Sequence, residues 1–400
     1  MRYNILALAD IHWGAMDAHE MADNLQLVLD FIEEYTRDHS LDMVVICGDY
    51  FDYRLTLNSK PAIFALKWFD ELFYICKKCG VKKLRAVKGT KEHDNDQWDA
   101  IRPKDSGEDE DAFFRKFLVT GAEETLPGLN CVYCPDETIN VKDHELEYTN
   151  ICTSTYDIGF FHGNFDAILP KFVIEQNLDQ KIPSIIYFKD VWQRRINGPM
   201  ISGHWHVFKD MDPLFYIGSF DRWKFGEEEP KGALFITYDT DNHSYYVKRL
   251  INPFARNFVE LQVDNSLCNT PEHFSYLQDQ IASIIEQDKR VQIKVKYQIS
   301  KNDPESVQNF DVFKNSVLGK IPRGVKYGVK FSVKDLIKRE KKMKRREEMS
   351  VDSSRYDYIL KSPMSVRSNI LTYLKRESNY DMDPQQLEEI IGKYLAPEYG

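Results

Sequence analysis

Short apolar segments recur along the first half of the chain, and polar residues follow each of them. The segments occupy residues 4–9, 43–47, 84–87, 158–161 and 199–202. Continuous apolar runs of this length are typical of strands buried on both faces of a sheet, because strands with one solvated face alternate instead. The pattern predicts an α/β fold with several buried strands.

A carboxylate or an imidazole stands just after each predicted strand. The motifs are Asp10-Ile11-His12, Gly48-Asp49, Glu92-His93-Asp94, His162-Gly163 and Gly203-His204-Trp205-His206, and they hold five of the ten histidines. In open α/β sheets ligands collect outside the carboxyl ends of the strands, so these motifs can meet in space. Their mixed oxygen and nitrogen donors suit two divalent cations. Any one histidine is more easily explained as an ordinary surface or core residue, but five motifs at five strand ends favour a metal-dependent hydrolase.

The order of these motifs resembles that of the calcineurin-like metallophosphoesterase superfamily. Its pattern is Asp-x-His, Gly-Asp-x-x-(Asp/His), Gly-Asn-His-(Asp/Glu), a lone His and Gly-His-x-His, and four of the five motifs match. The third is two residues longer, because Thr90, Lys91 and Glu92 separate Gly89 from His93, with Glu92 where the family has Asn. Thr90 or a water could take that ligand position instead. The resemblance implies an α/β fold built as a two-sheet α/β/β/α sandwich.

The same resemblance implies roles for nine residues. One metal would be held by Asp10, His12 and His206, the other by His162, His204 and Glu92, and Asp49 would bridge the two. Two such cations, manganese or else magnesium, can activate a shared water and clamp both oxygens of an in-line displacement at phosphorus. The catalytic residues would be His93 and Asp52. His93 would stabilise the transition state or protonate the leaving oxygen, and Asp52 would orient a neighbour or cap the following segment.

A longer resemblance narrows the class of phosphoesterase. Residues 215–232 follow the Gly-Ser-x-x-Arg-x-x-Phe-Gly-Glu…Lys-Gly segment of SbcD-type DNA-repair nuclease subunits, from Gly218-Ser219 to Lys231-Gly232. The alternative is that Gly218 and Ser219 merely end a strand and that the glutamates form a solvated turn. The resemblance implies a metal-dependent DNA exo/endonuclease, the nuclease subunit of an SbcCD-like recombination and repair complex.

Beyond residue 254 the hydrophobic pattern changes. Strands are predicted at 258–263, 291–299 and 329–333, and a helix with one apolar face at 271–287. These elements predict a small α+β capping domain over residues 255–335, after a metallophosphoesterase domain over residues 1–254. In SbcD-type proteins a domain of this kind helps to engage DNA.

A strongly basic stretch follows. Between Lys320 and Arg346 there are 12 Lys and Arg against two acidic residues, in a chain whose net charge is −10. The predicted linker over residues 336–363 could neutralise DNA phosphates or could be a solvated linker, which is the commoner use of such a run. The acidic total does not exclude a nucleic-acid partner, because local patches set the affinity.

Two short amphipathic C-terminal helices are predicted within residues 364–400. The second begins with Asp383 as its N-cap and Pro384 at its first position. Helices this short cannot bury their apolar stripes alone, so they dock on their own chain or on a partner. The resemblance implies the coiled coil of an SbcC-type ATPase as that partner. It also implies a homodimer, for which Phe64, Trp68 and Phe69 are either contacts or core residues.

Composition sets the outer limits. A chain of 400 residues has room for two or three domains. We expect a cytoplasmic protein, in the host cytoplasm if the gene is viral, because there is no signal-peptide pattern and no apolar run of roughly 18 residues. Seven cysteines, an odd number, favour reduced thiols. The pairs Cys76/Cys79 and Cys131/Cys134 are spaced too widely for a zinc ribbon, so chance is favoured over zinc.

Two other functions fit the motifs. One is a stand-alone phosphatase or small phosphodiesterase of the same superfamily, against which the capping domain and the C-terminal helices count. The other is a non-catalytic scaffold that kept the fold and lost its metals, against which the nearly complete set of site residues counts.

Overall fold

Two compact units make up the described part of the chain, the first built mainly from Met1–Leu261 and the second from later residues. The computed structural model describes residues 1–56, 58–94, 97–101, 117–136, 154–169, 186–263, 271–288, 290–299, 307–308, 310–315 and 328–335. The linker predicted at residues 336–363 and the helices predicted at 364–400 lie outside these ranges.

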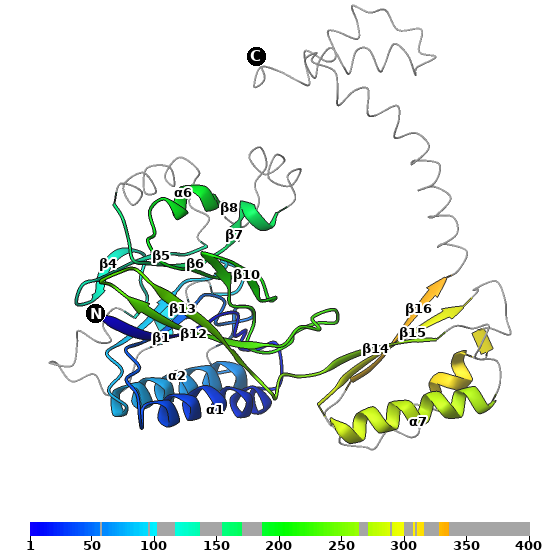
Figure 1. The fold of residues 1–400 in the computed structure, drawn as a ribbon. Coiled ribbons are helices and arrows are strands. Elements are labelled where there is room, and N and C mark those ends of the chain that lie inside the picture. Colours follow the sequence, from blue (N-terminus) through cyan, green and yellow to red (C-terminus); the bar gives the residue numbers. More distant parts are fainter. Residues whose placement is uncertain are drawn as a thin grey trace, which may run out of the picture. The chain divides into compact units, whose positions relative to one another are not determined.

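Two mixed sheets form the first unit (Figure 1), with strand orders β13-β12-β1-β2-β3 and β10-β11-β9-β6-β5-β4. The first contains β1 (Arg2–Leu8), β2 (Met43–Cys47), β3 (Lys83–Val87), β12 (Gly232–Asp239) and β13 (Tyr245–Ile251). The second contains β4 (Gly121–Leu126), β5 (Leu129–Cys134), β6 (Ile158–His162), β9 (Met200–Gly203), β10 (Lys209–Met211) and β11 (Leu214–Tyr216). β7 (Asn164–Phe165) and β8 (Ile186–Tyr187) pair separately. β1, β2 and β3 are parallel, as are β6 and β9, so their carboxyl ends share an edge within each sheet.

The two sheets pack face to face. Alternate side chains of a strand point to opposite faces of its sheet, so each strand contributes to two different cores. Ile5 of β1 lies in an apolar core that also holds Tyr133 of β5 and Phe160 of β6. The next residue, Leu6, lies in a second core with the helices. β2, β6 and β9 are buried along their whole length, as the continuous apolar runs predict. The predicted two-sheet sandwich is confirmed.

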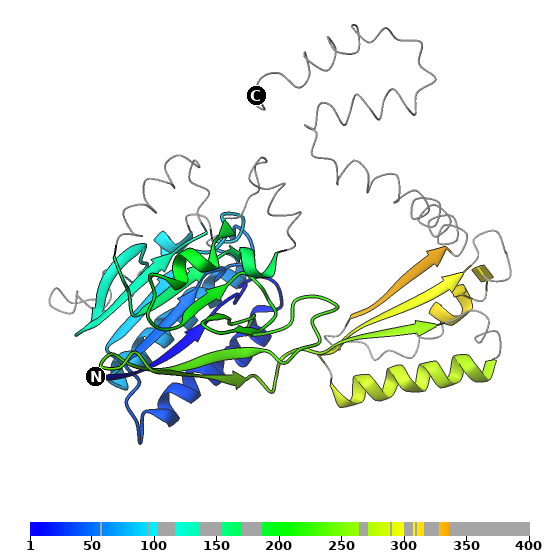
Figure 2. The ribbon, with the colours of Figure 1, turned by 45° about the horizontal axis from the view of Figure 1, so that its top comes forward.

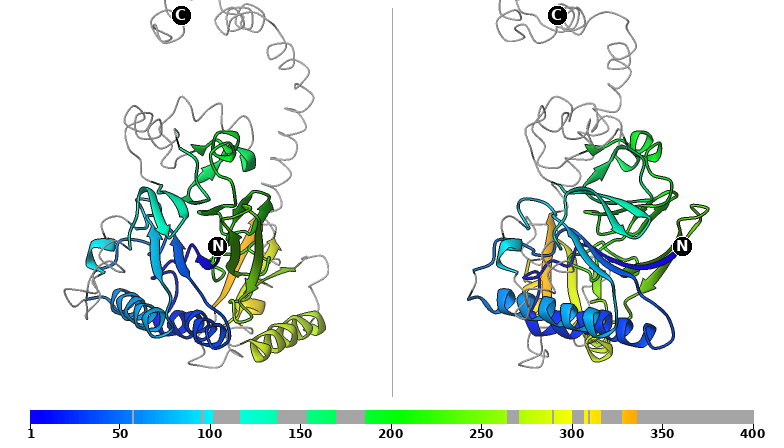
Figure 3. Two further views of the ribbon diagram at one scale, coloured as in Figure 1. Left: turned by 60° about the vertical axis from the view of Figure 1, so that its left-hand side comes forward. Right: turned by 90° about the vertical axis from the view of Figure 1, so that its left-hand side faces the viewer.

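Helices α1 (Ala18–Tyr35) and α2 (Lys60–Lys78) cover the other face of the first sheet, as Figure 3 shows. Asp17 is the N-cap of α1, and its carboxylate accepts a hydrogen bond from the His19 backbone N–H at 3.0 Å. The Ser59 side chain caps α2 by accepting from the Ala62 N–H. The second sheet carries the short helix α6 (Lys189–Gln193), which buries Trp192. Two 3₁₀ turns lie at Gln97–Ala100 and Asp166–Ile168.

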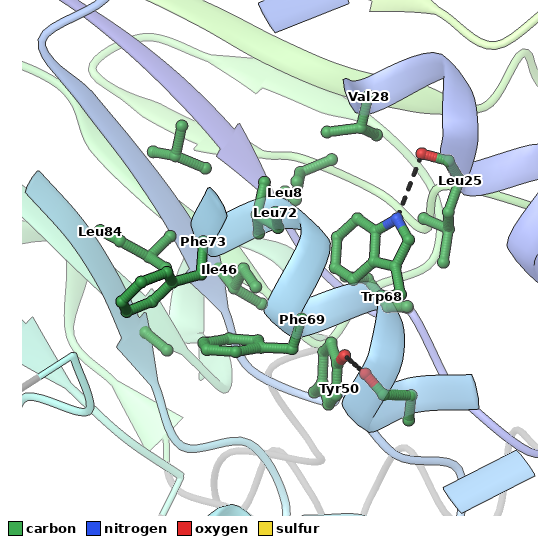
Figure 4. Close-up of a cluster of buried hydrophobic side chains, with 14 of the residues drawn as sticks. Leu8, Leu25, Val28, Ile46, Tyr50, Trp68, Phe69, Leu72, Phe73 and Leu84 are labelled. Atoms are coloured by element: carbon green, nitrogen blue, oxygen red, sulfur yellow. Dashed lines mark hydrogen bonds between the residues drawn. The ribbon is translucent and has the colours of Figure 1, made fainter. Parts of the chain in front are cut away.

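Large aromatic side chains fill the core between α1, α2 and the first sheet (Figure 4). Trp68 and Phe69 of α2 are buried there beside Leu8 and Ile46 of the sheet. Phe64 is only partly buried and packs against the same core. Of the two interpretations of these aromatics, core packing therefore holds for Trp68 and Phe69.

Trp68→Phe is expected to lower the free energy of unfolding by about 2 kcal/mol. The indole Nε1 of Trp68 donates to the Leu25 carbonyl of α1 at 3.3 Å, and phenylalanine loses both this hydrogen bond and ring volume. Urea unfolding followed by circular dichroism measures the change. Tyr74→Phe on the exposed side of α2 is the control and should leave stability unchanged, and an equal loss in both variants would contradict the prediction.

From Phe258 onward, three strands form a separate sheet with the order β14-β15-β16, and a helix lies between the first two in the sequence. They are β14 (Phe258–Val263), α7 (Pro271–Gln287), β15 (Gln292–Ile299) and β16 (Gly328–Asp335). α7 lies along one face of this sheet (Figure 2). The strands and the helix predicted here are present, and the domain boundaries stay predictions.

The two Cys-x-x-Cys pairs do not meet. Cys76 of α2 lies in the core between the helices and the first sheet. Cys131 lies in the core between the two sheets, and Cys134 lies on the opposite face of β5. Among the described residues no cysteine joins a potential metal cluster. The arrangement fits the interpretation that the pairs arise by chance.

Candidate metal centre

The strand ends that carry the five motifs come together. Backbone hydrogen bonds tie the loop after β1 to the loop after β2, with Asp10 N–H donating to the Gly48 carbonyl at 3.1 Å and His12 N–H to the Asp49 carbonyl at 3.0 Å. The loop after β9 joins them, because the His204 N–H donates to both carboxylate oxygens of Asp10 at 3.0 and 3.1 Å. The convergence predicted from the sequence is thus observed across the two sheets.

Three groups of side chains lie close enough to hold metal ions. They are Asp10–His12–His206, Asp49–His162–His204 and His12–Asp52–His93, and within each group the potential ligand atoms lie within 4.8 Å of one another. The first two groups are named here the Asp10 cluster and the Asp49 cluster. Together the three groups contain eight of the nine site residues predicted from the sequence.

In the Asp10 cluster, the Nε2 atoms of the two histidines face each other. The Nε2 atoms of His12 and His206 are 3.0 Å apart. Imidazole nitrogens are common ligands of divalent transition-metal cations, and these two face each other at hydrogen-bond distance. Asp10 is wholly buried beside them, and burial raises the pKa of its carboxyl above the ordinary value, against the lowering effect of the neighbouring histidines. The donor set therefore fits a divalent cation.

A carboxylate stands behind each of these two histidines. His206 Nδ1 is hydrogen-bonded to Glu227 Oε1 at 3.0 Å, whereas His12 Nδ1 lies 3.2 Å from Asp52 Oδ1 without the geometry of a hydrogen bond. Carboxylates in this position fix the ring orientation and leave Nε2 free to bind a metal. Asp52 thus lies where it can orient a neighbour, which is one of the two roles predicted for it.

The Asp49 cluster contains two ring nitrogens without a hydrogen bond. His162 Nδ1 donates to the Cys47 carbonyl at 2.7 Å, which leaves His162 Nε2 facing Asp49 Oδ2 at 3.2 Å. Neither His162 Nε2 nor His204 Nδ1 has a hydrogen-bond partner although both are buried. Unsatisfied buried polar atoms are costly and rare, so these nitrogens fit a metal ligand role.

In the Asp49 cluster, burial and the neighbouring charges shift the pKa values of His162 and Asp49 in opposite directions. Burial lowers the pKa of His162, but the Asp49 carboxylate overrides it and raises that pKa to about 10. Burial would also raise the pKa of Asp49, but His162 lowers it below its ordinary value. For His204, burial and the nearby His162 both lower the pKa, to about 3. Asp49 is thus an ionised carboxylate and His204 a neutral imidazole, which are the forms that bind metals, whereas His162 is protonated in this state and would have to release a proton to bind one.

Thr90, not Glu92, lies beside Asp49. Asp49 Oδ1 accepts hydrogen bonds from Thr90 N–H at 2.7 Å and from Thr90 Oγ1 at 2.9 Å, and Thr90 is buried. Glu92 is exposed and belongs to none of the three groups. The turn in which His93 and Asp94 N–H donate to the Thr90 carbonyl carries Glu92 outward. Thr90 directly follows Gly89, which is the signal that could have favoured it.

His93 lies at the edge of the centre. Its Nδ1 donates to the Asp52 carbonyl, which turns Nε2 toward Asp49 Oδ2 at 4.0 Å. The His93 side chain is 31% exposed, whereas those of His162 and Asp49 are almost wholly buried. A ring held in this way can contact a ligand that enters from solvent.

The backbone at the site adopts conformations that most residues avoid. Asp10, His12, Asp49 and His204 have φ angles of 50°, 56°, 50° and 85°. Non-glycine residues seldom adopt positive φ, and such strain concentrates at functional sites. Gly203 is needed for another reason, because a Cβ there would lie 2.1 Å from the Cys47 carbonyl oxygen.

Two further residues of the centre were missed by sequence reasoning. Asp94 is buried and accepts hydrogen bonds from the backbone N–H groups of Asp49, Tyr50, Phe51 and Gly89. Glu227 is the carboxylate behind His206. Both lie in motifs that the sequence displays, but their partners come from other loops.

Carboxylates and imidazoles gathered at the strand ends of two packed sheets define a metal-binding α/β sandwich. The chain belongs to the calcineurin-like phosphoesterase family, whose model matches residues 3–236. The family consists of metal-dependent phosphoester hydrolases, which agrees with the donor sets of the site. No curated protein matched the chain in a sequence comparison. Among the described residues, no helix has the length and apolar character needed to cross a membrane.

Proposed function

We propose that this protein is a two-metal-dependent DNA exo/endonuclease, the nuclease subunit of an SbcCD-like complex. The observation that carries the proposal is the contact between residues 215–232, the segment that resembles SbcD-type nucleases, and the candidate metal centre. Within that segment Glu227 contacts His206, and Trp223 Nε1 donates to the Asp10 carbonyl at 3.3 Å. A segment that merely ended a strand would not need to reach both residues.

The proposed chemistry uses side chains from all five motifs. One cation would be held by Asp10, His12 and His206, and the other by Asp49, His162 and His204, with Asp49 extending to both and Thr90 beside it. Cations bound there, manganese first and magnesium second, would lower the pKa of a shared water and neutralise charge on the scissile phosphate. His93 would donate a hydrogen bond from Nε2 to the phosphate or a proton to the leaving oxygen.

The proposed partners follow from the same resemblance. DNA would be the substrate, a coiled-coil ATPase of the SbcC type would bind the C-terminal helices, and the protein would form a homodimer. The basic linker and the small α+β domain would help to engage DNA through phosphate contacts, whose strength falls steeply with salt.

The test is an assay of the purified full-length protein with MnCl₂. Its substrates are end-labelled single- and double-stranded DNA, with para-nitrophenyl phosphate and bis-para-nitrophenyl phosphate alongside. Release of nucleotides that stops when EDTA is added supports the proposal. Monoester turnover without DNA cleavage would favour the phosphatase alternative, and neither activity with no bound metal would favour the scaffold.

His93→Ala is expected to lower the rate of DNA hydrolysis by about 10²-fold or more while bound manganese is retained. The reason is that His93 belongs only to the third group, His12–Asp52–His93, so its loss leaves all the ligands of the Asp10 cluster and the Asp49 cluster in place. Initial rates and metal analysis of the same preparation measure both effects. His39→Ala, at an exposed position after α1, is the matched control. Unchanged hydrolysis by the His93 variant would rule out the proposed role.

A further inference from the structure

We propose that Glu227 and Lys231 are positioning residues that hold His206 in place as a metal ligand. The proposal rests on the proposed function only in that His206 binds a metal. It assigns a task to the Glu and Lys of the Gly-Ser…Phe-Gly-Glu…Lys-Gly segment, which the sequence alone leaves without one.

Glu227 contacts His206 and two residues of its own segment. Its Oε1 lies 3.0 Å from His206 Nδ1, and its Oε2 accepts a hydrogen bond from the Trp223 N–H and forms an ion pair with Lys231 Nζ, both at 3.1 Å. The Glu227 side chain is only 3% exposed. A carboxylate so buried needs charged or hydrogen-bonding partners. Of the partners here, His206 is contacted directly and Lys231 also donates to the His206 carbonyl, whereas the Trp223 side chain donates to the Asp10 carbonyl.

Lys231 holds the same histidine from its other side. The Lys231 side chain is 1% exposed, and its Nζ donates to the His206 backbone carbonyl at 2.6 Å. The Ser219 N–H donates to that carbonyl at 3.2 Å. Lysine is almost never fully buried without a partner, and an apolar pair of the same size would often be at least as stable. Lys231 thus links the Glu227 carboxylate to the backbone of His206.

One histidine of each metal cluster has a different support behind its ring. His206 has the Glu227 carboxylate at 3.0 Å, whereas His162 of the Asp49 cluster donates to the neutral Cys47 carbonyl. A carboxylate orients the imidazole and makes it a more basic ligand, and its removal typically lowers metal affinity by about 10- to 100-fold. Loss of Glu227 should therefore weaken one metal equivalent and spare the other.

The experiment is a calorimetric Mn²⁺ titration of the full-length protein and its variants, with thermal unfolding in EDTA as a check on folding. Glu227→Gln is expected to weaken one equivalent by about 10- to 100-fold and to change the other by less than about twofold. Glu227→Asp keeps the negative charge but shortens the side chain by one methylene, so it should weaken the same equivalent by a smaller factor. Glu228→Gln, at the exposed neighbouring position, is the matched control.

A double mutant identifies the equivalent that is affected. In a His206→Ala background, Glu227→Gln should cause no further loss of affinity, because the ligand that it positions is already absent. Variants that lower the unfolding temperature but bind both equivalents like the wild type would overturn the proposal, as would a wild type that binds no Mn²⁺. A wild type that binds Mn²⁺ with the expected variant pattern but cleaves no DNA would contradict the nuclease function and leave this proposal standing.

Discussion

Asp49→Ala is expected to abolish the binding of both metal equivalents and to lower phosphodiester hydrolysis by about 10⁴-fold or more. Asp49 is the ionised carboxylate of its cluster, with Oδ2 facing His162 at 3.2 Å and Oδ1 held by Thr90. By resemblance to the family it also bridges to the second cation. A loss of about 6 kcal/mol of transition-state stabilisation, several for each cation, corresponds to roughly 10⁴-fold in rate.

The Asp49 prediction is checked by metal analysis after gel filtration and by initial rates with labelled DNA. Asp49→Asn separates charge from shape, because the amide can still accept from Thr90 but carries no negative charge. We expect it to lose metal nearly as completely as the alanine variant. Asp23→Asn, at an exposed position on α1, is the control. An Asp49 variant that retains both equivalents would show that Asp49 is not a shared ligand.

That the site residues lie close together could be predicted, because most of them directly follow a buried strand. Buried apolar runs mark the strands, and parallel strands bring their carboxyl ends to one edge. Asp10, Asp49, His162 and His204 each stand at such an end, so their meeting depends on the sheets alone. The separation of Trp68 and Phe69 from the surface could not be predicted, because a helix face packed on a sheet and one packed on a second copy have the same apolar pattern.

The details of the site depend on contacts between loops, which no local pattern reveals. Glu92 matches the family position next to His93, but a turn stabilised by the Thr90 carbonyl sends it into solvent. Thr90 reaches Asp49 in its place. Glu227 stands 21 residues from His206 in the sequence, and nothing in the intervening residues shows that the two side chains meet. Where a loop changes length, the position of a motif residue in space is therefore not fixed by its position in the motif.

Asp94→Ala is expected to lower the free energy of unfolding by about 4 kcal/mol or more and to weaken metal binding at the same time. The Asp94 carboxylate accepts the N–H groups of Asp49, Tyr50, Phe51 and Gly89 at 3.1, 2.9, 3.1 and 2.6 Å. Each buried N–H left without an acceptor costs roughly 1–3 kcal/mol. Asp94 thus fixes the loop after β2 against the loop after β3, and these loops carry Asp49 and Thr90.

Asparagine at position 94 separates the two consequences. Its amide offers one oxygen, so about half of the four N–H groups keep an acceptor, and the loss of stability should fall to about 2–3 kcal/mol. Urea unfolding in EDTA measures stability without metal, and a Mn²⁺ titration of the folded asparagine variant measures the effect on the loops. Asp23→Ala on the surface of α1 should change neither quantity. Full Mn²⁺ affinity in a destabilised Asp94→Asn variant would show that Asp94 supports the fold alone, whereas a joint loss would show that the same four hydrogen bonds hold the ligands in register.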